Sequence, residues 1–132
     1  MALAAKLDIG SKSYNLLECD YEFTQMVDQT GRPSDRPRGG LINIIIAAPG
    51  NTDLTLHEWM RDKNTTKSGK ISFTINMDKV DVSKTISFKD AYCIRLYEYF
   101  NKDNTIQMYL KITISAGTIT FGDNCEFTMI DK

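Results

Sequence analysis

Residues 17–48, LECDYEFTQMVDQTGRPSDRPRGGLINIIIAA, decide the fold of this chain. In the first part, Leu17, Cys19 and Tyr21 alternate with acidic residues, and this period-two pattern predicts a strand with one buried face. In the last part, residues 41–48 are apolar on both faces except at Asn43, which predicts a strand that is covered on both sides. The chain is therefore expected to be mainly β.

The loop between these two strands, residues 29–40, is too long for a hairpin turn. Pro33 and Pro37 fix their own φ angles and bias the arginines before them toward extended geometry. Glycines stand near both ends of the loop, where the chain must turn. These features predict a semi-extended arm with charged tips that projects from the domain. An ordinary mobile surface loop is the alternative.

One segment, residues 53–60, has helical periodicity. Asp53 or Thr55 can cap it, and Glu58 stands three residues after Thr55, as a capping box requires. The residues expected to pack this helix against the sheet share one apolar stripe: Leu56, Trp59 and Met60. The helix is expected to end near residue 64, with His57 on its solvated side.

Further strands follow to the C-terminus, and a short one precedes residue 10. The pattern predicts strands over residues 3–9, 71–77, 85–89, 92–100, 106–114 and 119–129, with a hairpin turn at residues 101–104. About eight strands and one helix predict a single domain over residues 1–132. It is expected to be a closed β-barrel with one short flanking α-helix and a long extended loop, and a sandwich is the alternative.

Composition narrows the classes of function. The 132 residues include 42% hydrophobic ones, enough for a core without metal or disulfide support. Because 16 basic residues face 17 acidic ones, no basic field would attract nucleic acid or an anionic membrane surface. Cys19, Cys93 and Cys125 are far apart and are expected to be reduced core residues. We expect synthesis in the cytoplasm without a signal peptide, and no membrane insertion.

The residues offer little for catalysis. His57 is the single histidine, and no cysteine or second histidine stands at ligand spacing, so we expect no catalytic residue, no metal and no cofactor. The acidic residues Glu18, Asp20 and Glu22 repeat along one strand face, which is typical of a face turned to water. The chain is therefore not expected to be an enzyme.

Two strands, residues 41–48 and 92–100, carry more apolar surface than one short helix can cover. A neighbouring copy would have to supply the second cover, and a surface that pairs with a different patch on the next copy closes into a ring when the rotation closes. The subunit-interface candidates lie on these strands: Ile42, Ile44, Ile45, Ile46, Tyr97 and Tyr99.

The order of segments resembles a known family, the haemolysin-coregulated protein (Hcp) tube proteins of type VI secretion systems, in the divergent form found in Bacteroidetes. The resemblance spans nearly the whole chain and rests on whole segments in order: YEFTQMVD, QTGRPSDRPRGG, LINIIIAA, DLTLHEWM, SFKDAYCIRLYEYF and MYLKITISAG.

This resemblance implies hexameric rings that stack into a hollow tube related to contractile-phage tail tubes. It implies sheath, spike and baseplate proteins and secreted effectors as partners, and exit from the cell through the type VI apparatus. It also implies a loop that contacts the adjacent ring, made of Thr30, Gly31, Arg32, Pro33, Ser34, Asp35, Arg36, Pro37, Arg38 and Gly39. The alternative from another class is a monomeric intracellular barrel that binds a small apolar ligand.

Overall fold

The computed structural model describes residues 2–25, 27–33, 40–50 and 52–128. Strands dominate it, as expected, and one helix, α1, spans Thr55–Arg61. The strands are β1 Ala2–Ile9, β2 Lys12–Tyr21, β3 Leu41–Ala47, β4 Lys67–Met77, β5 Val80–Phe100, β6 Met108–Ser115, β7 Thr118–Phe121 and β8 Cys125–Thr128.

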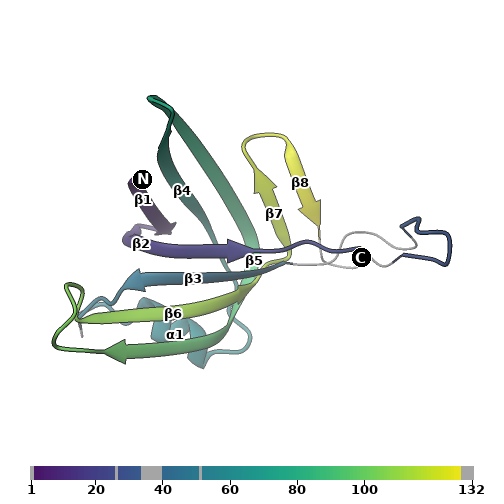
Figure 1. Cartoon of the computed structure of the whole chain (residues 1–132). Coiled ribbons are helices and arrows are strands. Elements are labelled where there is room, and N and C mark those ends of the chain that lie inside the picture. The colour runs from purple at the N-terminus through teal and green to yellow at the C-terminus, as the bar shows by residue number, and fades with distance from the viewer. Residues whose placement is uncertain (1, 26, 34–39, 51, 129–132) are drawn as a thin grey trace.

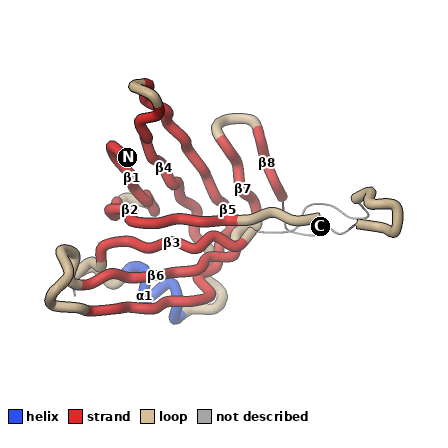
Figure 2. The backbone as a smooth tube through the Cα atoms, in the orientation of Figure 1, coloured by secondary structure: helices blue, strands red, loops and turns tan. Residues whose placement is uncertain are grey.

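Antiparallel pairing closes the strands into a ring. The order is β4–β1–β2–β3–β6–β5, and β4 pairs with β5 to complete it, while β7 and β8 continue from β5. Closure gives most strands a partner on both sides, which removes most of the exposed edges of an open sheet. The expectation of a small β-barrel is confirmed, and α1 lies beside β5 (Figures 1 and 2).

Strand β5 is the longest element, with 21 residues, although the sequence pattern predicts two separate strands in its place. It turns at Asp90, whose φ is +53°, and continues instead of ending. Its first half pairs with β4 and β7, and its second half pairs with β6. The chain therefore has two sheets that share β5 and β2. Sheet B is formed by β3, β6, residues 16–21 of β2 and residues 92–100 of β5. Sheet A is formed by β1, β4, β7, β8 and the first parts of β2 and β5.

The core lies between the sheets and α1. Alternate residues of β3 point into it, and Ile42, Ile44 and Ile46 have no exposed surface. Leu56 and Trp59 of α1 belong to the same cluster, and the Trp59 indole Nε1 donates to the Thr65 carbonyl at 3.2 Å. The predicted packing stripe of the helix is thus confirmed for these two residues. Met60, by contrast, is 38% exposed.

Local departures from the expected pattern have identifiable causes. Strand β2 begins at Lys12 and ends at Tyr21, and a bulge between Leu16 and Glu18 turns Leu17 to the surface. The β5–β6 hairpin is confirmed, but its loop covers residues 101–107, closed by the Asn101 N–H donating to the Gln107 carbonyl at 2.7 Å.

The capping box predicted for the helix is wrong. The N-cap is Leu54, which makes no side-chain capping bond, and the Asp53 carboxylate accepts the Thr55 N–H at 3.1 Å instead. The helix then ends at Arg61, three residues before the predicted position. One predicted strand residue, Met129, lies outside the described residues.

The packing around Gly69 leads to a stability prediction. A Cβ at this position in β4 would lie 2.5 Å from the Asp8 carbonyl oxygen and 2.6 Å from the Phe88 ring. Gly69→Ala should lower the free energy of unfolding by about 2 kcal/mol through overpacking. The melting temperature should fall by about 5 °C in thermal unfolding.

Gly50 provides the matched control, because a Cβ there meets nothing within 4 Å and its φ is not positive. Gly50→Ala should melt within about 1 °C of the wild type. Equal melting temperatures for both variants would contradict this account of Gly69.

Candidate functional site

Sheet B has two edges at which, among the described residues, no further strand pairs. At one edge, residues 16–21 of β2 pair with β3 alone, and at the other, residues 92–100 of β5 pair with β6 alone. Each edge carries a bulge, at Leu16/Glu18 and at Cys93/Arg95. Unpaired backbone N–H and C=O groups along a strand are a template for pairing with another chain. These edges are therefore the candidate assembly surfaces.

The face of sheet B turned away from the core is partly polar and partly aromatic. A chain of hydrogen bonds crosses three strands: Thr113 Oγ1 donates to Asn43 Oδ1 at 2.7 Å, and Asn43 Nδ2 donates to Asp20 Oδ1 at 2.8 Å. Toward the β5 edge the face becomes aromatic, since Tyr97 is 45% exposed and Tyr99 is 36% exposed. The Tyr99 ring lies 5.1 Å from the ring of Tyr109.

The structure separates the six interface candidates into two groups. Ile42, Ile44 and Ile46 point into the barrel's own core and have no surface left for a neighbouring subunit, so their prediction as contact residues is wrong. The predicted apolar surplus of β3 is instead used inside the chain. Tyr97, Tyr99 and the half-buried Ile45 lie on the opposite face and keep accessible surface.

The arm begins with a small hairpin organised by one carboxylate. Asp28 Oδ1 accepts the Thr30 N–H at 2.9 Å, the Thr30 hydroxyl at 2.7 Å and the Arg32 N–H at 3.1 Å, while the Asp28 N–H donates to the Arg32 carbonyl. Val27 and Pro33 pair across its base. These bonds hold the pKa of Asp28 below its usual value, and the bond from the Thr30 side chain has the largest effect. Residues 34–39 lie outside the described residues.

No catalytic constellation is found in the described part of the chain. No group of three or more His, Cys, Asp or Glu side chains among those residues could hold a metal ion. The prediction of a solvated His57 holds only in part: the side chain is 31% exposed, but its Nε2 lies 2.8 Å from Glu98 Oε1 on β5 and its Nδ1 is buried. This pair ties α1 to the sheet, and the sequence could not reveal it because Glu98 is 41 residues away.

The three cysteines are free thiols with different environments. Burial raises the pKa of Cys19 and of Cys93 to about 11, so both stay protonated. Cys125 is exposed at the start of β8, which corrects the expectation that all three belong to the core. The acidic face is confirmed, since Glu18, Asp20 and Glu22 are all exposed.

Within the described residues, no helix has the length and apolar character needed to cross a membrane. Sequence reasoning named Tyr97 and Tyr99, which the structure leaves exposed on sheet B, but it missed Asp28 and the free strand edges. An Asp two residues before Thr-Gly is a signal for a side-chain-capped turn, which could have marked Asp28. The free edges of sheet B depend only on which strands pair, so no local sequence pattern predicts them.

A family model described as hemolysin coregulated protein Hcp (TssD) matches residues 1–128. Hcp1 from Flavobacterium johnsoniae is 29% identical, with a TM-score of 0.78 over 96% of this chain and 99% of that one. The fold is shared with Hcp1 from the E. coli EAEC 042 pathovar, at 8% identity, TM-score 0.74 and coverage of 96% and 99%. It is also shared with the anti-feeding prophage cap, at 17% identity and a TM-score of 0.52. That match covers 89% of this chain and 87% of the cap protein. No curated protein sequence matches the chain.

Removing the Asp28 carboxylate should loosen the hairpin of the arm. In Asp28→Ala, the Thr30 and Arg32 amides lose their acceptor and should exchange with solvent deuterons about tenfold faster. Because the pKa of Asp28 is lowered in the folded chain, the protection should persist down to the usual pH range of aspartate. It should disappear as the pH falls through that lowered pKa.

Asp28→Asn is the control, since its amide oxygen still accepts these bonds and should retain most of the protection without the pH dependence. Unchanged exchange of both amides in Asp28→Ala, measured by NMR, would show that the carboxylate does not organise the loop.

Proposed function

The chain belongs to the hemolysin coregulated protein Hcp (TssD) family of type VI secretion tube subunits, and we propose that its copies close head to tail into hexameric rings that stack into a hollow tube. The Flavobacterium relative agrees with the Bacteroidetes-type form of the family. A tube subunit is a structural protein and not an enzyme. The observation that carries the ring proposal is the pair of unpaired edges of sheet B.

The directions of the strands support head-to-tail closure. Successive strands of sheet B are antiparallel in the order β2–β3–β6–β5, so the two edge strands run in opposite directions. Rotation about a tube axis would bring the β5 edge of one copy beside the β2 edge of the next. The new pair would be antiparallel, like every other pairing in the chain. Because the two edges differ, the contact is heterologous, which is the type that generates rings.

Tyr97 and Tyr99 stand beside this junction. Both lie on the edge strand β5 and face away from the core, so their rings would pack against side chains of the neighbouring β2, where Glu18 and Asp20 are exposed. Ile45 lies one strand inside the β2 edge, opposite Glu18, and its exposed part would adjoin the same contact. Large aromatic residues often dominate the energy of such interfaces.

The polar part of the same face would line the lumen. The Asp20, Asn43 and Thr113 side chains satisfy one another across three strands, so the polar groups of this surface have hydrogen-bond partners. A hydrated lining suits passage of proteins that must not adhere. We propose secreted effectors as the cargo of this channel.

The arm would join successive rings. Its hairpin at residues 27–33 projects away from the barrel beyond the end of β2 (Figure 1), and we propose that Thr30–Gly39 contacts the adjacent ring. Sheath, spike and baseplate proteins are the further partners proposed for the assembled tube. We also propose synthesis in the cytoplasm and exit through the type VI apparatus.

The packing gives no support to the alternative, a monomeric barrel that binds a small apolar ligand. Large side chains occupy the space between the sheets, among them Trp59 and Phe88, which are each 1% exposed. A small ligand needs a concave, largely preformed cavity in that position. The family assignment and the core therefore favour the same structural role.

The ring proposal predicts that Tyr97 and Tyr99 stabilise the assembly. In the double variant Tyr97→Ala/Tyr99→Ala, the concentration at which rings dissociate should rise at least about tenfold, because two interface aromatics are truncated. Native mass spectrometry and light scattering over a dilution series measure this. Ser72→Ala, on the far face of sheet A, should leave dissociation unchanged, and a solitary wild-type particle at high concentration would overturn the ring.

Stacking is tested separately by shortening the arm. Replacing residues 31–38 with a two-residue turn should leave the rings intact and abolish tubes, because the contact with the next ring is removed while sheet B is untouched. Electron micrographs of wild-type and shortened protein at equal concentration show the difference. Normal tubes from the shortened variant would count against the role assigned to the arm.

A further inference from the structure

The β4–β5 hairpin extends well beyond the barrel. Its outer part, residues 74–83, which we call the ribbon, projects past the β2 edge of sheet B (Figures 1 and 2). Val80 and Val82 alternate with polar residues and lie on the same strand face as the buried Ile86. They are nevertheless 61% and 41% exposed, because the core ends before it reaches them. They form an exposed apolar face, which the half-buried Ile75, paired with Val82, adjoins.

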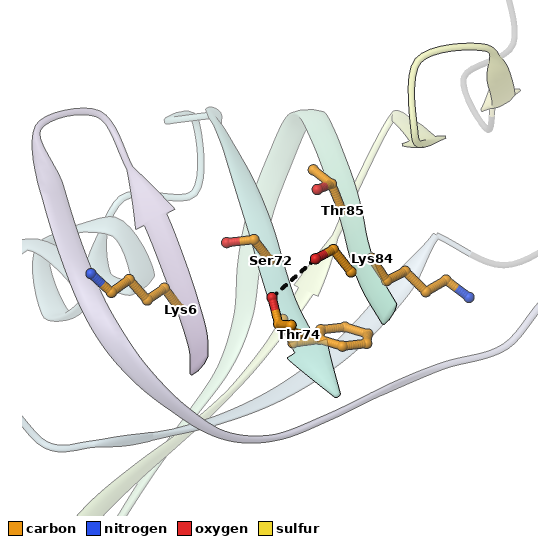
Figure 3. A pocket seen from close by; sticks show the side chains of 7 residues that line it. Lys6, Ser72, Thr74, Lys84 and Thr85 are labelled. Carbon is orange, nitrogen blue, oxygen red and sulfur yellow. Dashed lines mark hydrogen bonds between the residues drawn. The ribbon is translucent and has the colours of Figure 1, made fainter. Parts of the chain in front are cut away.

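The opposite face of the ribbon is polar. Thr74 and Ser83 share a hydrogen bond of 3.1 Å between their hydroxyls, and Asn76 Nδ2 donates to Asp81 Oδ1 at 3.0 Å. Figure 3 shows this face from close by, with Ser72, Thr74 and Thr85 on the paired strands. The ribbon therefore has one polar face that is hydrated and one exposed apolar face.

The ribbon is held in a defined conformation. Its turn residues Asp78 and Lys79 have φ angles of +51° and +66°, the pair of positive values that a type I′ hairpin turn requires. Such a turn matches the twist of the flanking strands, which pair continuously from Ser72/Thr85 to Met77/Val80. An ordered apolar surface loses little conformational entropy on binding.

A matching groove lies at the other edge of sheet B. It has a volume of about 450 Å³ and runs between the C-terminal end of α1 and the start of the β5 edge. Met60, Tyr92 and Ile94 line it and are exposed. Ile94 is 49% exposed because the bulge at Cys93/Arg95 turns it out of the sheet. The groove is thus a second apolar surface that the chain does not cover itself.

We propose that, in the ring, the apolar face of the ribbon of one copy covers this groove on the next copy. The inference rests on the proposed ring, because head-to-tail closure brings the β2 side of one copy against the β5 side of its neighbour. The ribbon projects on the first side and the groove lies on the second. A single rotation therefore serves both the edge pairing and this contact.

The charges at the two surfaces are complementary. The groove carries Asp62 and Lys63, and the tip of the ribbon carries Asp78 and Lys79, so each surface offers one acid and one base to the other. Hydrogen bonds from Thr65 Oγ1 and the Asn64 N–H hold the pKa of Asp62 below its usual value, so it stays charged at neutral pH. Such pairs fix the register of an apolar contact more than they add affinity.

Size gives a further reason to expect a second contact. A stable interface buries about 800 Å² on each partner, and pairing along one strand edge alone covers less. Each edge also has a bulge that interrupts straight pairing. The ribbon and groove supply additional apolar area outside the sheet, on the side of α1.

Cross-linking tests the contact in the full chain. Val80→Cys/Ile94→Cys is made in a Cys125→Ser background, in which Cys19 and Cys93 react slowly because their thiols stay protonated. A short bismaleimide should join successive copies and give a ladder of covalent species ending at six chains on a denaturing gel. The matched control Thr74→Cys/Ile94→Cys moves one thiol to the polar face and should give no ladder.

The outcomes separate this inference from the proposed function. Hexamers by native mass spectrometry without a ladder, or with an equal ladder from the Thr74 control, overturn the ribbon contact and leave the ring in place. Absence of hexamers in every variant and in the wild type overturns both.

A charge variant gives an independent readout. Val82→Asp should raise the ring dissociation concentration at least about tenfold, because a carboxylate would be buried in the contact. Thr74→Asp, on the wet face, should change it less than about twofold. Circular dichroism confirms that each variant is folded, and equal dissociation of the two overturns the contact.

Discussion

The structure depends on the backbone hydrogen bonds of β5, which pairs with β4 and β7 along its first half and with β6 along its second half. This strand enters as part of sheet A, turns at Asp90 and leaves as the edge of sheet B. The turn is held by the Gly117 N–H, which lies 3.0 Å from the Lys89 carbonyl and 3.2 Å from that of Asp90. Because one strand serves both sheets, the two sheets face each other over the core. At its two ends β5 leaves a projecting ribbon and a free edge.

This arrangement explains how the chain uses its apolar residues. In β3, the inward residues Ile42, Ile44 and Ile46 complete the core, so the second apolar face of this strand is only Leu41, Ile45 and Ala47. The sequence could predict that β3 was heavily buried, but not which face met its own chain and which remained free. Only the pairing of Ile44 with Cys19 and Ile112 decides that question.

The strands and the helix could be predicted from local patterns, because alternation and helical spacing act over a few residues. Three features could not. The continuity of β5 through Asp90 depends on Gly117, the outward turn of Leu17 depends on a bulge, and the contact of His57 depends on Glu98. Each involves a partner distant in sequence or a register shift, and neither leaves a local pattern. For the same reason the sequence could suggest Tyr97 and Tyr99 as exposed aromatic residues of the candidate site, but it could not reveal the strand edges.

The distribution of wet and dry surfaces follows from the same geometry. Hydroxyl and amide side chains satisfy each other on the outer face of sheet B and on the outer face of the ribbon, through the Asn43–Thr113 and Thr74–Ser83 hydrogen bonds. Among the apolar groups that the core does not reach are Val80 and Val82 at the start of β5 and Ile94 in its second half. A chain whose dry surfaces lie on opposite sides cannot cover both with a two-fold dimer through one patch. It can cover both only when every copy has a neighbour on each side, which is the condition that a closed ring meets.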